Sequence, residues 1–147
     1  MRWTVLLILL WINYPTLLSQ NYTFNQEEEH FVLLLQNEAF SIPYESAAEL
    51  AKYNAQKQSE KQLEIKRYSI PFLSSLSILF VKSFPSANES AQYVKRLQKD
   101  LPSIMTNDII ESVWTISASN FQLLLKRKDK AEYHEFMKKN YDIITKN

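Results

Sequence analysis

The sequence contains no cysteine and no glycine, and each absence excludes a class of chemistry. Without cysteine the chain can form no disulfide, no thiolate nucleophile and no cysteine metal site. Without glycine it lacks the phosphate-binding loops, dinucleotide fingerprints and nucleophile elbows in which glycine permits positive φ or close approach of the backbone. The common classes of nucleotide-binding enzyme are therefore disfavoured, and we expect no cofactor.

Histidine is scarce as well, and no other pattern in the sequence specifies catalysis. His30 and His134 fall on different predicted elements, with no neighbouring ligands at metal spacing. The carboxylates Glu49, Glu89 and Glu132 stand where helix capping accounts for them. We therefore expect a protein that is not an enzyme, has no metal site and takes no small-molecule substrate. A small periplasmic enzyme is the weakest alternative.

A strong excess of charge of one sign is also missing, since the net charge of the 147 residues is +1. Residues 1–19 have the features of a secretory signal peptide: Arg2, an apolar run that Thr4 alone interrupts, then Pro15 and Ser19. A retained membrane anchor is the alternative, but the run is shorter than the roughly 20 residues that span a bilayer. Cleavage after Ser19 would leave equal numbers of acidic and basic residues. Export and zero net charge both argue against a nucleic-acid partner.

What is present is enough apolar sequence, 46% of the residues, for one domain with a real core. Residues 20–29 are polar and are expected to form a flexible lead-in, and residues 30–147 to form the domain. Runs that are apolar throughout, or that alternate, predict four strands. These strands are expected at 30–36, 63–70, 76–81 and 112–117.

Helix start signals lie between the predicted strands. Ser86 and Glu89 form a capping box, and Ser46 with Glu49 repeats the pattern. The first helix is expected to run over 46–57, and Pro102 is expected to end the second near residue 100. After the fourth strand we expect a short turn at residues 119–125. A third cap, at Asp129, should then start the last helix.

The order strand, helix, strand, strand, helix, strand is that of a ferredoxin-like βαββαβ sandwich, an α+β fold with a four-stranded antiparallel sheet. Both helices should cover one face, and the first and third strands should be central. Because these two strands are apolar on both faces, the other face also needs a cover. The C-terminal helical extension, residues 121–141, is the expected cover, and a partner protein is the alternative.

Aromatic and basic side chains are the candidate partner contacts. Tyr68 and Trp114 lie on predicted strands, where exposed rings would stack on a partner, although most aromatic residues belong to the core. Lys126, Arg127 and Lys128 form a basic cluster before the last helix. The cluster is either a solvated linker or a contact with an anionic partner, such as lipid headgroups or an acidic protein surface.

Several stretches resemble the C-terminal domain of the tetratricopeptide-repeat proteins of bacterial gliding motility and type IX secretion. That family shows a similar opening strand, a similar "IA-x-FN" helix and a similar ending around "ISxxNF…KNY". The matching stretches here are HFVLLLQ (30–36), LAKYNAQ (50–56), LEIKRYSI (63–70), ILFVKSFPSANESAQYVKRL (78–97) and WTISASNFQLLLKRKDKAEYHEFMKKNY (114–141). The likeness covers most of the sequence after residue 30, but the tandem repeats themselves are missing.

The resemblance implies an exported, non-enzymatic accessory subunit of a secretion or motility machine, in the periplasm or on the periplasmic face of the outer membrane. Its partner would be a protein complex in that compartment, and the family supplies no site residues. Residues 78–97 are also similar to the strand-to-helix segment of septal peptidoglycan-binding SPOR domains. Lys82 and Ser83 stand where those domains have glycine. The similarity makes peptidoglycan the alternative partner, and the missing glycine argues against glycan binding.

Overall fold

The computed structural model describes residues 20–37, 45–57, 63–105 and 109–145, with residues 45 and 142–145 described by their backbone alone. The expected signal peptide, residues 1–19, lies outside the described residues. The elements in chain order are β1 (His30–Gln36), α1 (Glu45–Lys57), β2 (Glu64–Ser69), β3 (Ser77–Phe84), α2 (Ala87–Ile104), β4 (Ile110–Ser117), α3 (Ala118–Arg127) and α4 (Lys130–Thr145).

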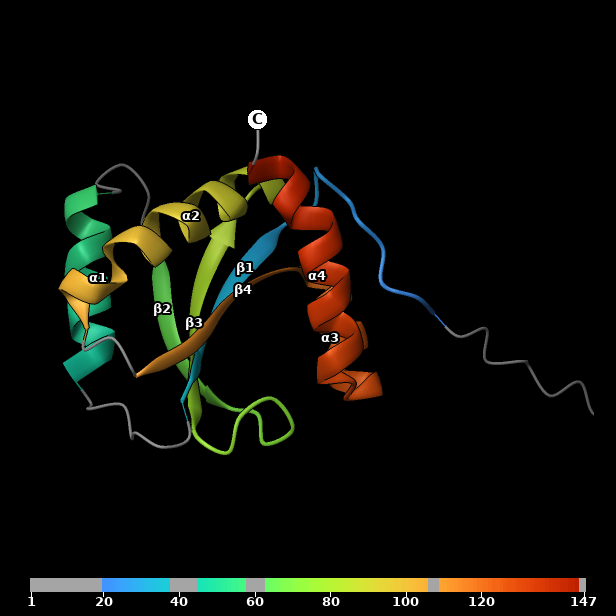
Figure 1. Ribbon diagram of the computed structural model, residues 1–147, viewed down its shortest axis with the longest axis horizontal. Coiled ribbons are helices and arrows are strands. Elements are labelled where there is room, and N and C mark those ends of the chain that lie inside the picture. The colour runs from blue at the N-terminus through green and yellow to red at the C-terminus, as the bar shows by residue number, and fades with distance from the viewer. Residues whose placement is uncertain (1–19, 38–44, 58–62, 106–108, 146–147) are drawn as a thin grey trace, which may run out of the picture.

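The four strands form one antiparallel sheet in the order β2-β3-β1-β4, which confirms the ferredoxin-like prediction (Figure 1). β1 and β3 are central, as expected, and β2 and β4 are the edges. The register sets Leu33 opposite Phe80 on one side and Trp114 on the other. Because side chains alternate along a strand, these three residues share one face of the sheet.

The helices α1 and α2 cover the first face of the sheet. Their apolar stripes pack on a cluster of buried residues from all the layers: Val32, Leu34, Leu50, Tyr53, Leu79, Val81, Phe84, Tyr93, Leu97, Met105, Ile110 and Val113. The hydroxyl of Tyr93 donates to the Asn54 side-chain oxygen at 2.7 Å, which joins α2 to α1 inside this core. Burial of the Tyr93 ring raises the pKa of its hydroxyl, so the group stays a neutral donor.

The second face carries a separate core beneath α3, α4 and the loop before β3. Its buried members are Tyr22, Leu33, Leu35, Ile70, Leu73, Ile78, Phe80, Trp114, Ile116, Leu124 and Tyr133. The C-terminal extension therefore covers this face, as expected. Among the strands it packs chiefly against β4, and α4 also packs against α2 (Figure 1). Within the described residues, neither α3 nor α4 makes more than a minor contact with β2.

The helix boundaries confirm some capping predictions and correct others. Ser86 caps α2, accepting from the Glu89 amide at 3.3 Å, and Asp129 accepts from the Glu132 amide at 3.0 Å. Ser46 is not a cap, because α1 already begins at Glu45. Pro102 does not end α2, which continues to Ile104: proline keeps a helical φ and costs one N–H close to the helix end.

The segment after β4 was expected to be a short turn, and this was wrong. Ser117, the last residue of β4, is also the N-cap of α3, and its hydroxyl accepts from the Asn120 amide at 3.3 Å. The strand therefore passes directly into a ten-residue helix without a connecting loop. Leu124 of α3 is fully buried against the second face.

The lead-in was expected to be flexible, and the structure instead ties it to the domain. Tyr22 is buried in the second core, and the Asn120 amide group donates to the Thr23 carbonyl at 2.8 Å. The Ala87 amide donates to the Gln26 carbonyl at 2.9 Å. The polar composition hid these contacts, because a segment without regular secondary structure can still be fixed by backbone hydrogen bonds to helix ends.

Candidate functional site

Four aromatic rings meet on the second face, between the first turn of α3 and the edge strand β2. Phe80 of β3 is the centre, with Phe31, Phe121 and Tyr68 at centroid distances of 5.0, 5.2 and 5.4 Å. Phe80 is buried, Phe31 and Phe121 are half-buried, and Tyr68 is 42% exposed. We call these four residues the aromatic patch. Tyr68 meets Phe80 edge to face, and Phe31 and Phe121 are tilted against it. Edge-to-face ring pairs are attractive beyond the area they bury.

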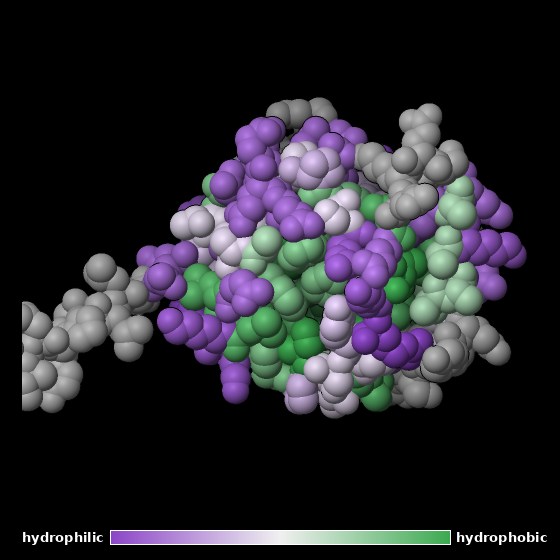
Figure 2. Space-filling view, turned by 180° about the vertical axis from the view of Figure 1, so that it is seen from behind, coloured by the Kyte–Doolittle hydropathy of each residue, from purple (hydrophilic) through white to green (hydrophobic). Residues whose placement is uncertain are grey.

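Charged residues border the aromatic patch along β2. The Glu64 carboxylate accepts from the ammonium groups of Lys66 at 2.8 Å and Lys82 at 3.1 Å. These hydrogen bonds lower the pKa of Glu64 and keep it ionised. An apolar centre with an ionic border is the usual anatomy of a protein interface. Figure 2 shows hydrophobic side chains gathered at the middle of the face opposite to that of Figure 1, with hydrophilic ones around them.

Of the sequence-predicted contacts, Tyr68 lies on this exposed surface, and Trp114 does not. Trp114 shares the second face, but α4 covers it and leaves 2% of it exposed. Its ring stacks on His134 at 5.5 Å and contacts Tyr133 at 5.7 Å. The expectation that Trp114 contacts a partner is therefore wrong, because Trp114 is a core residue against which α4 packs.

The basic cluster is divided by the structure. Arg127 is internal to the fold: it pairs with Glu132, donates to the Gln20 carbonyl at 3.0 Å and lies 5.3 Å from the centre of the Tyr22 ring. Lys126 and Lys128 are exposed. Lys126 and Lys128 thus stay candidate contacts, whereas Arg127 ties the lead-in and α4 to α3.

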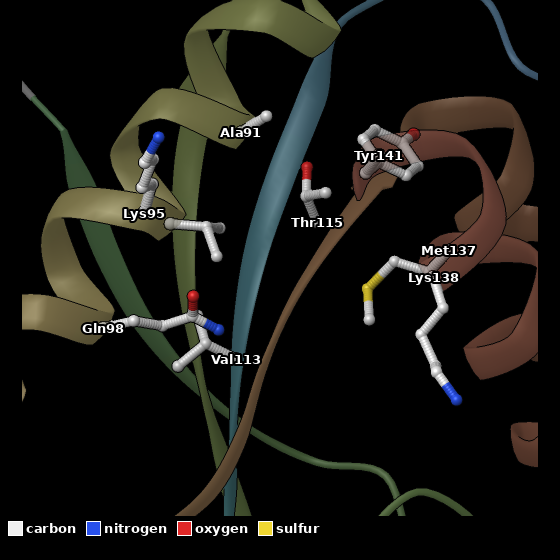
Figure 3. Close-up of a pocket in the computed structure, with 9 residues that line it drawn as sticks. Ala91, Lys95, Gln98, Val113, Thr115, Met137, Lys138 and Tyr141 are labelled. Atoms are coloured by element: carbon white, nitrogen blue, oxygen red, sulfur yellow. The ribbon is translucent and has the colours of Figure 1, made fainter. Parts of the chain in front are cut away.

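A groove separates α2 from α4, with β4 as its floor (Figure 3). Its cavity has a volume of about 260 Å³. Both helices and the strand contribute apolar and polar side chains to its walls, among them Val94, Gln98, Val113, Thr115, Met137 and Tyr141. We call it the α2–α4 groove. No local sequence pattern predicts this groove, because its walls come together only when α4 docks.

Buried polar contacts hold Tyr141, which lines the α2–α4 groove. The ring nitrogens of His30 contact the Glu28 carbonyl at 2.7 Å and the Tyr141 hydroxyl at 2.8 Å. The Tyr133 hydroxyl donates to the Thr115 carbonyl at 2.6 Å. Burial lowers the pKa of His30 more than the Glu28 carbonyl and charge raise it, and burial raises the pKa of Tyr141. Both groups are therefore neutral near pH 7 and serve as a structural link between β1 and α4.

The described part of the chain contains no group of three or more histidine, aspartate or glutamate side chains placed to hold a metal ion. Within the same residues, no helix has both the length and the apolar character needed to cross a membrane. Comparison with family models, with curated proteins and with solved structures finds no match to this chain.

Proposed function

We propose that this protein is a non-enzymatic, exported interaction module, an accessory subunit of a protein complex in the periplasm or at the outer membrane. The aromatic patch is the observation that carries the proposal. Tyr68 is one of only two large hydrophobic side chains that are exposed within the described residues. It lies beside two half-buried phenylalanines on a sheet face that the tail covers only in part.

An aromatic cluster of this kind is better suited to a protein surface than to catalysis. Tyrosine and phenylalanine bury a large area at low entropic cost and are enriched at the centres of interfaces. Lys126 and Lys128 are exposed at the C-terminal end of α3, and their positive charge favours a partner surface with acidic residues. The resemblance to the terminal domain of gliding and type IX secretion proteins, and the signal-peptide pattern, suggest the compartment.

The test is to purify the tagged protein from its native cells in mild detergent and to follow its complex by size-exclusion chromatography. Tyr68→Glu places a charge in the centre of the patch and is expected to dissociate the complex. Lys52→Glu is the matched control, because Lys52 is exposed on α1, which covers the other face. Recovery of the wild-type protein alone, or equal behaviour of the two variants, would contradict the proposal.

The second candidate function is peptidoglycan binding, since an exposed tyrosine ring can also stack on a sugar. Cosedimentation with purified peptidoglycan sacculi tests it. If Tyr68→Glu abolishes cosedimentation and Lys52→Glu leaves it intact, the partner is a glycan and not a protein. We expect no cosedimentation, because a single exposed ring gives little sugar specificity and the bordering Glu64, Lys66 and Lys82 pair with one another.

A further inference from the structure

We infer that the α2–α4 groove is a second docking site, which takes an acidic protein segment anchored by one aromatic side chain. The inference goes beyond the proposed function, because it concerns a different surface and can be tested without the native partner. Size, lining chemistry and charge lead to it separately.

The volume of the groove fits a single large side chain. A cavity of about 260 Å³ has the volume of about nine molecules of liquid water, at about 30 Å³ each. Side-chain atoms pack more densely than a liquid, so one aromatic ring fits within it. The volume is below that of most small-molecule pockets, about 300–1,000 Å³. A side-chain anchor therefore fits the groove better than a cofactor or a drug-sized ligand.

The lining of the groove suits an aromatic ring. Val94 and Val113 provide apolar walls, and Figure 3 shows the Met137 sulfur turned into the space between α4 and β4. A thioether beside a ring edge is a favourable contact, and methionine adapts its shape to what it meets. Gln98 points its amide toward Val113 and can bond the backbone of an incoming segment.

The positive charges at the rim of the groove favour acidic residues on both sides of the aromatic anchor in the bound segment. Lys95 stands on the α2 rim and Lys138 on the α4 rim, and none of the described lining residues is acidic. Figure 3 shows both ammonium groups pointing away from the centre of the groove. They would meet carboxylates on either side of the anchor and not the anchor itself. Both lysines already interact within the protein, Lys138 with Glu135 at 3.3 Å, but exposed pairs of this kind are weak.

The walls are held in place before any partner arrives. The hydroxyl of Thr115, which lines the groove, contacts the Ser90 hydroxyl at 2.7 Å, and His30 contacts the Tyr141 hydroxyl at 2.8 Å. Tyr141 packs on Ala87 and Ala91 of α2. A preformed pocket lowers the entropic cost of binding, which favours a short anchored segment.

The probe for this site is the acetylated and amidated pentapeptide DEFED, followed by NMR on the whole mature chain. We expect saturable shifts of the Met137 methyl group at submillimolar peptide, weakening as salt is added. Two peptides control the probe: DEAED lacks the anchor, and KRFRK reverses the charge. Neither is expected to shift this methyl group over the same range.

The double variant Lys95→Glu with Lys138→Glu is expected to weaken DEFED binding about tenfold or more. Its matched control is Lys99→Glu with Lys139→Glu, which makes the same charge change on exposed positions of the same two helices. Gln98→Phe, also at an exposed position, would fill the groove and abolish binding while leaving the melting temperature unchanged.

Absence of a Met137 shift at millimolar DEFED, equal binding of DEAED, or equal effects of the two double variants would overturn the inference. These outcomes do not depend on Tyr68. Peptide binding here together with an unaffected complex in Tyr68→Glu would reject the proposed function while keeping this site.

Discussion

His30 joins the start of β1 to the end of α4 from a position with no solvent exposure. In the neutral ring, Nδ1–H donates to the Glu28 carbonyl and Nε2 accepts from the Tyr141 hydroxyl. Its pKa is lowered chiefly by burial. The folded protein therefore binds fewer protons than the unfolded chain just below the ordinary histidine pKa.

The pH dependence of stability follows from this sign. The His30 contribution is complete above about pH 6.5, the unfolded value, and is lost as pH falls from there to the lower folded pKa. One proton gives a slope of at most about 1.4 kcal/mol per pH unit. Urea unfolding of wild type and His30→Gln at about pH 7 and about pH 5 measures it. We expect the variant to lose less stability on acidification, and an equal loss would contradict the assignment.

Lys128 occupies the left-handed position at the C-terminal end of α3, where glycine is the usual residue. It adopts the left-handed conformation, φ 57° and ψ 29°, and its amide donates to the Leu124 carbonyl at 2.8 Å. A residue with a Cβ pays about 1–2 kcal/mol for this conformation, and glycine does not.

Lys128→Gly should therefore stabilise the protein by about 1 kcal/mol, measured by urea unfolding. Lys126→Gly is the control, because the same change inside the helix should destabilise it by about 1 kcal/mol. A loss of stability in Lys128→Gly would mean that the helix does not end in this way.

At the scale of elements, the stability of α2 depends on its N-cap, Ser86, which the sequence pattern predicted. Ser86→Ala removes the acceptor of the Glu89 amide and should cost about 1 kcal/mol of unfolding free energy. Ser75→Ala, in the exposed loop before β3, should change stability by less than about 0.5 kcal/mol. Equal effects in chemical unfolding would show that the hydroxyl does not cap the helix.

The strands and the capped helix were predictable because their signals are local. The apolar run at 30–36 became β1 with the same bounds, and Ser86 caps α2 as expected. The errors arose where one residue serves two elements or where an exception to a local rule is tolerated. Ser117 is both the end of β4 and the cap of α3, and Pro102 lies inside the last turn of α2.

The candidate site was predictable only in part, for a related reason. Tyr68 lies on an edge strand, so its exposure follows from position in the sheet. Trp114 lies on the other edge strand, in a stretch that alternates in the same way, but α4 packs over it. No local sequence pattern distinguishes the buried Trp114 from the exposed Tyr68. Arg127 and the α2–α4 groove depend on contacts between distant segments in the same way.

At the scale of the whole molecule, the lead-in belongs to the domain through Tyr22. Its ring meets Tyr133 at 5.0 Å in the second core, and burial raises the pKa of its hydroxyl to about 12. Tyr22→Ala should cost about 3 kcal/mol in chemical unfolding. Tyr22→Phe is the control and should be neutral, because the buried hydroxyl makes no hydrogen bond among the described residues. An unchanged free energy of unfolding in Tyr22→Ala would mean that the lead-in is flexible, as the sequence alone predicted.

The molecule as a whole presents a sheet with one closed face and one face that is open toward β2, where the partner is expected to dock. Site-specific photo-crosslinking in native cells tests this most directly, with the reactive amino acid placed at position 68 or, as control, at position 52 of α1. The account predicts one discrete crosslinked product from position 68 and none from position 52. No product at position 68, or the same product from both positions, would contradict it.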